Sequence, residues 1–113
     1  MNIQVFGTKK SFDTKKAQRY FKERRVPFQF IDLKEKQMSK GELESVCRAV
    51  GGIEALIDAK AKDADTVALL TYLSADQKFD KLLENQQVIA EPVVRCGKQA
   101  TLGYAPEVWK TWE

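Results

Sequence analysis

Residues 3–17 decide the fold, and they read Ile3-Gln4-Val5-Phe6-Gly7-Thr8-Lys9-Lys10-Ser11-Phe12-Asp13-Thr14-Lys15-Lys16-Ala17. An apolar strand is predicted over residues 2–6, followed by a loop over residues 7–11. A helix is then expected from about Phe12 to Arg25, because Ala17, Tyr20 and Phe21 have the i, i+3, i+4 spacing of a buried helix face. The stretch therefore passes from a strand through a short loop into the start of a helix.

The next segment completes a βαβ unit. Pro27 permits an extended start for Phe28-Gln29-Phe30-Ile31, whose alternating pattern is typical of a strand. Two strands joined by a helix within about 30 residues are expected to be parallel, with a right-handed crossover.

The C-terminal part returns to β structure. Pro92-Val93-Val94-Arg95-Cys96 is predicted to be a strand that turns through Gly97-Lys98-Gln99 and pairs with Ala100-Thr101-Leu102. Pro106 suits the first turn of a last helix. Its apolar residues are expected to pack on the sheet; they are Val108, Trp109 and Trp112.

The middle of the chain is predicted to be helical. Ser39 and Ser74 each precede a Glu or Gln at the spacing of a capping box, and Gly51-Gly52 is a plausible helix stop. A further helix is expected near Thr66–Leu73. The element order predicts one α/β domain over residues 1–113, with a thioredoxin-like (glutaredoxin-type) mixed four-stranded sheet and a helical insertion at about residues 38–86.

Composition excludes several function classes. The net charge of +3, from 19 basic and 16 acidic residues, is too small to indicate direct nucleic-acid binding. Histidine is absent, which removes the commonest general base and the commonest metal ligand. A zinc site is therefore not expected, and no other metal or cofactor is predicted. No apolar run approaches the ~20 residues of a membrane span, and no signal-peptide pattern stands at the N-terminus. A cytoplasmic monomer is the default expectation.

The two cysteines have different surroundings. Cys47 lies on an apolar helical stripe and is interpreted as a small buried hydrophobe. Cys96 stands between Arg95 and Gly97-Lys98, where basic neighbours favour a thiolate, although an incidental turn-edge position is the preferred interpretation. Two cysteines do not make a disulfide framework.

Four stretches in register resemble the arsenate reductase (ArsC)/Spx family of thioredoxin-fold proteins, over nearly the whole chain. They are Val5-Phe6-Gly7 leading into Ser11–Ala17, Val26-Pro27-Phe28-Gln29-Phe30-Ile31-Asp32, Ile53-Glu54-Ala55-Leu56-Ile57-Asp58-Ala59-Lys60, and Glu91-Pro92-Val93-Val94 with Leu102-Gly103-Tyr104. The resemblance implies a cis peptide bond before Pro92, beside the family's active site.

The departures from the family pattern bear on activity. Ser11 stands where the family's catalytic cysteine would lie, and Thr14 stands at the second cysteine of the Spx-like Cys-x-x-Cys. Three positions implied to carry oxyanion-binding arginines hold Lys60, Glu91 and Tyr104 instead. A serine without a base is a poor nucleophile, and Glu91 is expected to repel an oxyanion. Arsenate reduction is therefore not expected.

The candidate ligand site lies at the helix entry. Its predicted residues are Lys10, Ser11, Phe12, Asp13, Thr14, Lys15, Lys60, Glu91, Pro92 and Tyr104. Free N–H groups at the helix start favour a weak anion site, but capping by Ser11 or Asp13 is the preferred interpretation. Phe12 is interpreted either as a plug in the cleft that the cysteine would use or as an apolar contact for a partner.

Three functions remain open at this point. The first is a non-catalytic binding or regulatory protein, a pseudo-enzyme, for which the resemblance to Spx implies the C-terminal domain of the RNA polymerase α subunit as a partner. The second is a thiol-dependent reductase that uses glutathione and Cys96. The third is a protein that binds a small anion without chemistry.

Overall fold

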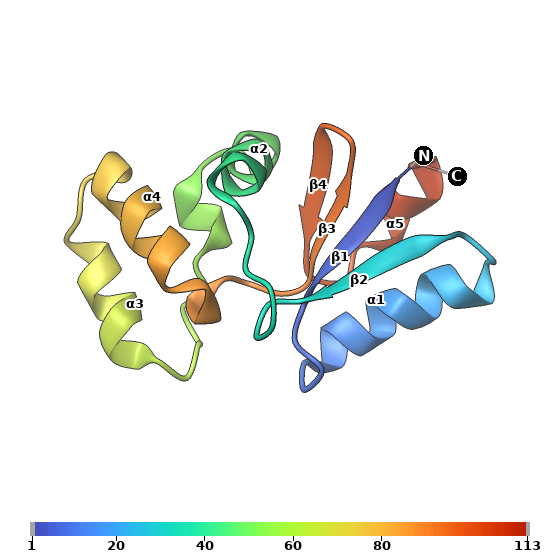
Figure 1. Ribbon diagram of the computed structural model, residues 1–113, viewed down its shortest axis with the longest axis horizontal. Coiled ribbons are helices and arrows are strands. Elements are labelled where there is room, and N and C mark those ends of the chain that lie inside the picture. Colours follow the sequence, from blue (N-terminus) through green and yellow to red (C-terminus); the bar gives the residue numbers. More distant parts are fainter. Residues whose placement is uncertain (1, 113) are drawn as a thin grey trace.

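A mixed four-stranded sheet forms the centre of the structure, a computed structural model that describes residues 2–112 (Figure 1). The order of the strands is β2-β1-β3-β4. Strand β1 is parallel to β2, whereas the β1–β3 and β3–β4 pairs are antiparallel. Their bounds are Ile3–Gly7 for β1, Phe28–Asp32 for β2, Val93–Cys96 for β3 and Gln99–Leu102 for β4. The predicted βαβ and ββ units are both present, with strand ends shifted by about one residue.

The sheet buries both of its faces because successive side chains point to opposite sides. Val5 lies opposite Val94 in the register of β1 and β3, and both belong to the cluster under helices α1 (Phe12–Glu23) and α5 (Pro106–Trp109). Phe6 lies opposite Val93, and both belong to the cluster on the other face, with helix α2. One helical layer thus covers each face.

Helices α1 (Phe12–Glu23) and α5 (Pro106–Trp109), the latter continued by η3 (Lys110–Trp112), cover the first face. The predicted face of α1 is buried as expected, but the helix stops before Arg25, which has a left-handed φ of 57°. Trp109 and Trp112 are buried, and their indole N–H groups donate to β4. The prediction for Val108 is wrong: it faces outward and is 39% exposed.

The segment between β2 and β3 is helical. It comprises α2 (Lys40–Val50), η1 (Ile53–Leu56), α3 (Ala64–Thr71), α4 (Ala75–Glu84) and η2 (Gln86–Val88). Both predicted capping boxes are present, at Ser39 and Ser74, and Gly51 ends α2 with a φ of 91°. Helix α3 begins two residues earlier than predicted because Asp63 caps it by accepting from the Thr66 N–H.

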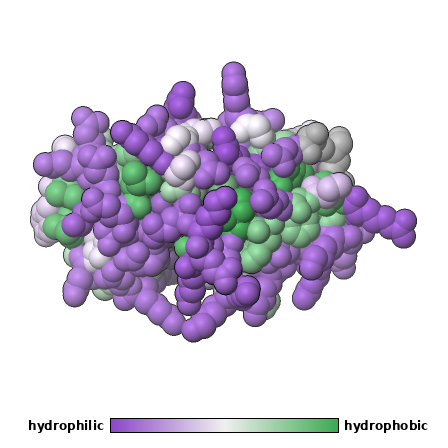
Figure 2. Space-filling model, viewed as in Figure 1, coloured by the Kyte–Doolittle hydropathy of each residue, from purple (hydrophilic) through white to green (hydrophobic). Residues whose placement is uncertain are grey.

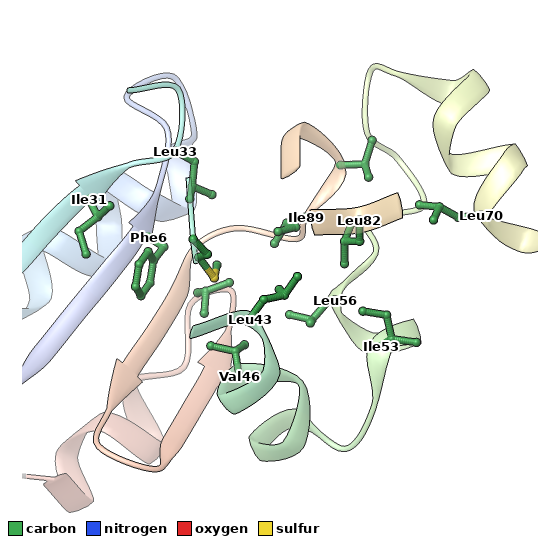
Figure 3. Close-up of a cluster of buried hydrophobic side chains, with 13 residues drawn as sticks. Phe6, Ile31, Leu33, Leu43, Val46, Ile53, Leu56, Leu70, Leu82 and Ile89 are labelled. Carbon is green, nitrogen blue, oxygen red and sulfur yellow. The ribbon is translucent and has the colours of Figure 1, made fainter. Parts of the chain in front are cut away.

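One hydrophobic cluster joins the sheet to this helical segment. It runs from Phe6 and Ile31 through Leu43 and Val46 of α2 to residues of η1, α3 and α4 (Figure 3). The buried amide of Gln86 reinforces the connection, because it accepts from the backbone N–H of Met38 at 2.8 Å and donates to its carbonyl oxygen at 2.9 Å. Gln86 also donates to the Leu83 carbonyl at 3.1 Å. The helical segment therefore shares its core with the sheet.

The surface seen in Figure 2 is mostly hydrophilic, with scattered hydrophobic patches. Across residues 2–112, no helix has both the length and the apolar character that a membrane crossing requires.

Candidate functional site

Ser11 is the N-cap of α1. Its backbone is extended (φ −72°, ψ 124°), and its Oγ accepts a hydrogen bond from the Thr14 N–H at 3.2 Å. Such a cap satisfies one of the backbone donors left free at a helix start. Asp13, the other capping candidate, lies exposed in the first turn. The hydroxyl of Ser11 is thus used to start the helix.

The carboxylate of Glu91 reaches across the sheet end into the loop before α1. Its Oε1 accepts from the Thr8 N–H at 2.6 Å, from the Thr8 hydroxyl at 2.9 Å and from the Thr14 hydroxyl at 3.2 Å. The peptide bond between Glu91 and the buried Pro92 is cis, as the family resemblance implied. Glu91 therefore occupies both donors of Thr8 in the loop and the hydroxyl of Thr14 in the first turn of α1.

Gly7 makes this approach possible. A Cβ atom built on Gly7 would overlap the Thr14 Oγ1 and would lie 2.9 Å from the Thr14 Cγ2 and 3.1 Å from the Glu91 Oε1. Thr14 is fully buried, so it has little room to move aside. Gly7, Thr8, Thr14 and Glu91 form one packed unit, called here the Glu91 cluster. Sequence reasoning missed Gly7 and Thr8, whose sequence positions carry no sign of a contact with residue 91.

An open cleft of about 780 Å³ lies next to the Glu91 cluster. Four of the predicted residues line it: Lys10, Ser11, Lys60 and Glu91. Sequence reasoning missed two further lysines of the lining, Lys34 and Lys62, and its apolar contacts Leu33 and Ile89. The cleft therefore combines positive charge with apolar surface.

The remaining predicted residues do not line the cleft; they are Phe12, Asp13, Thr14, Lys15, Pro92 and Tyr104. Phe12 is 74% exposed, so the interpretation of its ring as a plug in the cleft is wrong. Its ring lies instead beside Lys16, whose Nζ is 5.8 Å from the Phe12 ring centroid and 4.4 Å from that of Tyr104. These three side chains form a second surface feature, called here the aromatic patch.

Neither cysteine lines the cleft. Cys96 is the last residue of β3 and lies opposite Ile3 of β1. It follows Pro92 by four residues, a separation of about 13 Å at the usual rise per residue of a strand. Cys47 is half-buried on α2, where it was predicted to be buried, and burial together with the Glu54 carboxylate raises the pKa of its thiol. Within residues 2–112, no cluster of three or more Cys, Asp or Glu side chains is placed to hold a metal ion.

The sheet order, the helix that starts at Ser11 and the cis-proline beside it define a thioredoxin-like protein. The model of the ArsC family matches residues 6–112, and the chain belongs to the ArsC family. A comparison with curated protein sequences gave no match.

Solved structures with the same fold include several ArsC relatives. An ArsC family related protein from Bacteroides fragilis has a TM-score of 0.85 and 14% identity, covering 100% of this chain and 98% of that one. An arsenate reductase from Vibrio cholerae has a TM-score of 0.82 and 23% identity, covering 96% and 94%. A Staphylococcus aureus COL protein, solved by NMR, has a TM-score of 0.77 and 25% identity, covering 96% of each. The predicted thioredoxin-like fold class is confirmed.

Proposed function

We propose that this chain is a non-catalytic, Spx-like binding or regulatory member of the ArsC family, in which the helix-entry site has lost its redox chemistry. The observation that carries the proposal is the Glu91 cluster, in which a carboxylate of the chain itself accepts from the donors of Thr8, which lines the cleft, and from the hydroxyl of the buried Thr14. Three further observations, on Ser11, on charge and on the cysteines, support it.

The first concerns the nucleophile. Reduction of arsenate needs a thiolate that attacks arsenic, whereas Ser11 offers a neutral hydroxyl, whose oxygen accepts from the Thr14 N–H as the helix cap. A hydroxyl reacts as a nucleophile only with an adjacent base. The sequence has no histidine, and the neighbouring carboxylate of Glu91 is engaged with Thr8 and Thr14.

The second concerns the charge presented to a substrate. An oxyanion placed against the donors of Thr8 and Thr14 would lie beside the Glu91 carboxylate. Two like charges about 4 Å apart repel by about 1 kcal/mol in water and about 4 kcal/mol near a protein surface. The cluster therefore disfavours the oxyanions that arsenate reductases bind.

The third concerns the remaining thiols. Cys96 lies at the far end of β3 and Cys47 lies on α2, so neither is placed to replace the missing sulfur at position 11. The raised pKa of the Cys47 thiol also lowers the fraction of thiolate at neutral pH.

Arsenate reduction and thiol–disulfide exchange, each measured with glutathione and glutaredoxin as reductants, test the proposal. The wild-type chain and a Cys47→Ala/Cys96→Ala variant should both give only the background rate. A Ser11→Cys substitution in that variant supplies the matched control, because its new thiol should react with a chromogenic thiol reagent. Turnover by the wild type at enzymatic rates, retained in the double-alanine variant, would contradict the proposal.

The ligands expected from sequence stay predictions. They are the RNA polymerase α C-terminal domain, glutathione and a small anion. A partner such as the RNA polymerase α C-terminal domain agrees with the proposed role. A reaction with glutathione would instead require one of the free thiols of the chain, such as Cys96, to take part.

A further inference from the structure

We propose that the aromatic patch of Phe12, Lys16 and Tyr104, together with the lysines beside it, binds an acidic segment of a partner protein that packs one apolar residue against the exposed Phe12 ring. This inference rests on the proposed non-catalytic binding role and names the chemistry of the partner.

The patch places large apolar groups in solvent next to the site. Phe12 is the first residue of α1 and is 74% exposed, although the residue before it, Ser11, is half-buried in the cap. Tyr104 is 41% exposed. Aromatic side chains are enriched where proteins bind one another and often dominate the binding energy. The Phe12 ring contributes little to the core, so its placement fits recognition better than folding.

The Tyr104 side of the patch is held in place by the core. The Tyr104 ring packs edge-on against Trp109, with 5.5 Å between centroids. Trp109 is fully buried, and its indole N–H donates to the Thr101 hydroxyl at 2.8 Å. Lys16 lies near both exposed rings and joins them. Because the Tyr104 ring is already held against Trp109, it loses little side-chain entropy on binding.

The charges around the patch select an acidic partner. Three exposed lysines lie within three residues of Phe12 in the sequence: Lys9, Lys10 and Lys15. Three more line the neighbouring cleft, which Lys10 and Ser11 also line: Lys34, Lys60 and Lys62. Within residues 2–112 the ion pairs are Lys78–Glu54 and Arg95–Glu42, so none of these lysines has a carboxylate partner there.

The acidic side chains of the same region are fewer than the lysines. Asp13 beside Phe12 and Glu107 on α5 are exposed, whereas the acids of the cleft are hydrogen-bonded. Glu91 binds Thr8 and Thr14, Asp58 accepts from the Lys60 N–H, and Asp63 accepts from Thr66 and Gln87. A second copy of the chain would bring the same excess of lysines to the interface and would be repelled. An acidic segment is instead attracted and steered to the surface.

The probe is a short, terminally blocked peptide in which a single leucine is flanked on both sides by aspartates and glutamates. Titration into the ¹⁵N-labelled full chain at low salt should shift the backbone signals of residues 8–16 and 104. Phe12→Ser should weaken binding by about tenfold, on the scale of an interface anchor residue. Tyr72→Ser is the matched control, because Tyr72, the C-cap of the distant α3, is 86% exposed and its removal should leave the affinity unchanged.

Variants of the probe separate the alternatives. A peptide with glutamine and asparagine in place of the acids, and one with alanine in place of leucine, should each bind more weakly. The proposal is overturned by the absence of shifts at the patch, by equal binding of the neutral peptide, or by tighter binding of a single-stranded oligonucleotide of equal charge. Such a failure leaves the redox assay of the proposed function unaffected, and reductase activity would contradict that function whatever the peptide does.

Discussion

Replacement of Glu91 by alanine should destabilise the fold although Glu91 lies in an open cleft. The substitution removes an acceptor that serves the Thr8 N–H and the hydroxyls of Thr8 and Thr14. Hydrogen bonds to a charged group contribute about 1.5–3 kcal/mol. Because water in the cleft can replace part of what is lost, we expect the free energy of unfolding to fall by about 2 kcal/mol for the whole set.

Urea unfolding followed by tryptophan fluorescence measures this change, because Trp109 and Trp112 are both buried. The midpoint should fall by about 1 M with an unchanged slope, which would assign the effect to stability. Glu91→Gln keeps one acceptor oxygen and should give an intermediate value. Glu54→Ala is the control, since it removes an exposed carboxylate paired with Lys78 and should leave the midpoint nearly unchanged. If Glu91→Ala unfolded at the same midpoint as Glu54→Ala, the Glu91 cluster would not hold the loop.

The remaining predictions concern the same loop and the helix caps. Ser11→Ala should lower the free energy of unfolding by about 1 kcal/mol, whereas Ser11→Asp should retain most of it, because aspartate also caps a helix; the same urea experiment distinguishes them. Gly7→Ala should lower the free energy of unfolding by about 1–3 kcal/mol, because the new methyl group overpacks against Thr14, and the loss should be smaller in a Thr14→Ala background. Gly41→Ala is the control: a Cβ atom there meets no atom within 4 Å, so this substitution should not lower the free energy of unfolding. Hydrogen bonds from the Thr66 hydroxyl, then from Gln87 and the Thr66 N–H, lower the pKa of Asp63 below its ordinary 3.8, so its charge stabilises the fold above that pH. The wild type should therefore melt at a higher temperature than Asp63→Asn at neutral pH, and this difference should disappear as the pH falls through the lowered pKa of Asp63 in the folded state. A difference in melting temperature that stays constant across that pH range would show that the charge of Asp63 is not its cause.

The parts of the fold that were predictable from sequence depend on residues close together in the chain. The capping boxes at Ser39 and Ser74 are read within four residues, and the buried face of α1 follows from the spacing of Ala17, Tyr20 and Phe21. The alternating pattern of Phe28–Ile31 likewise identified β2, and short apolar runs identified β1 and β3. Val108 was misplaced because a helix of four residues has too short a pattern to separate its inner from its outer face.

The site was less predictable because its contacts join distant segments. Glu91 meets Thr8 and Thr14 across 83 and 77 positions, and no local pattern announces such a contact. The family resemblance placed Glu91 at the site, but like-charge reasoning alone suggested only repulsion of a ligand. The exposure of Phe12 was also hidden, since an aromatic residue at a helix start is compatible with either a filled cleft or a free surface.

The side chain of Gln86 has a consequence for how the cleft works. The Gln86 amide lines the cleft and forms hydrogen bonds with both the N–H and the carbonyl oxygen of Met38, which lies between β2 and α2. Widening the cleft would break these bonds in a buried, water-poor place, where unmatched amides are expensive. The spacing between the two walls of the cleft is therefore fixed in the fold, independently of any ligand.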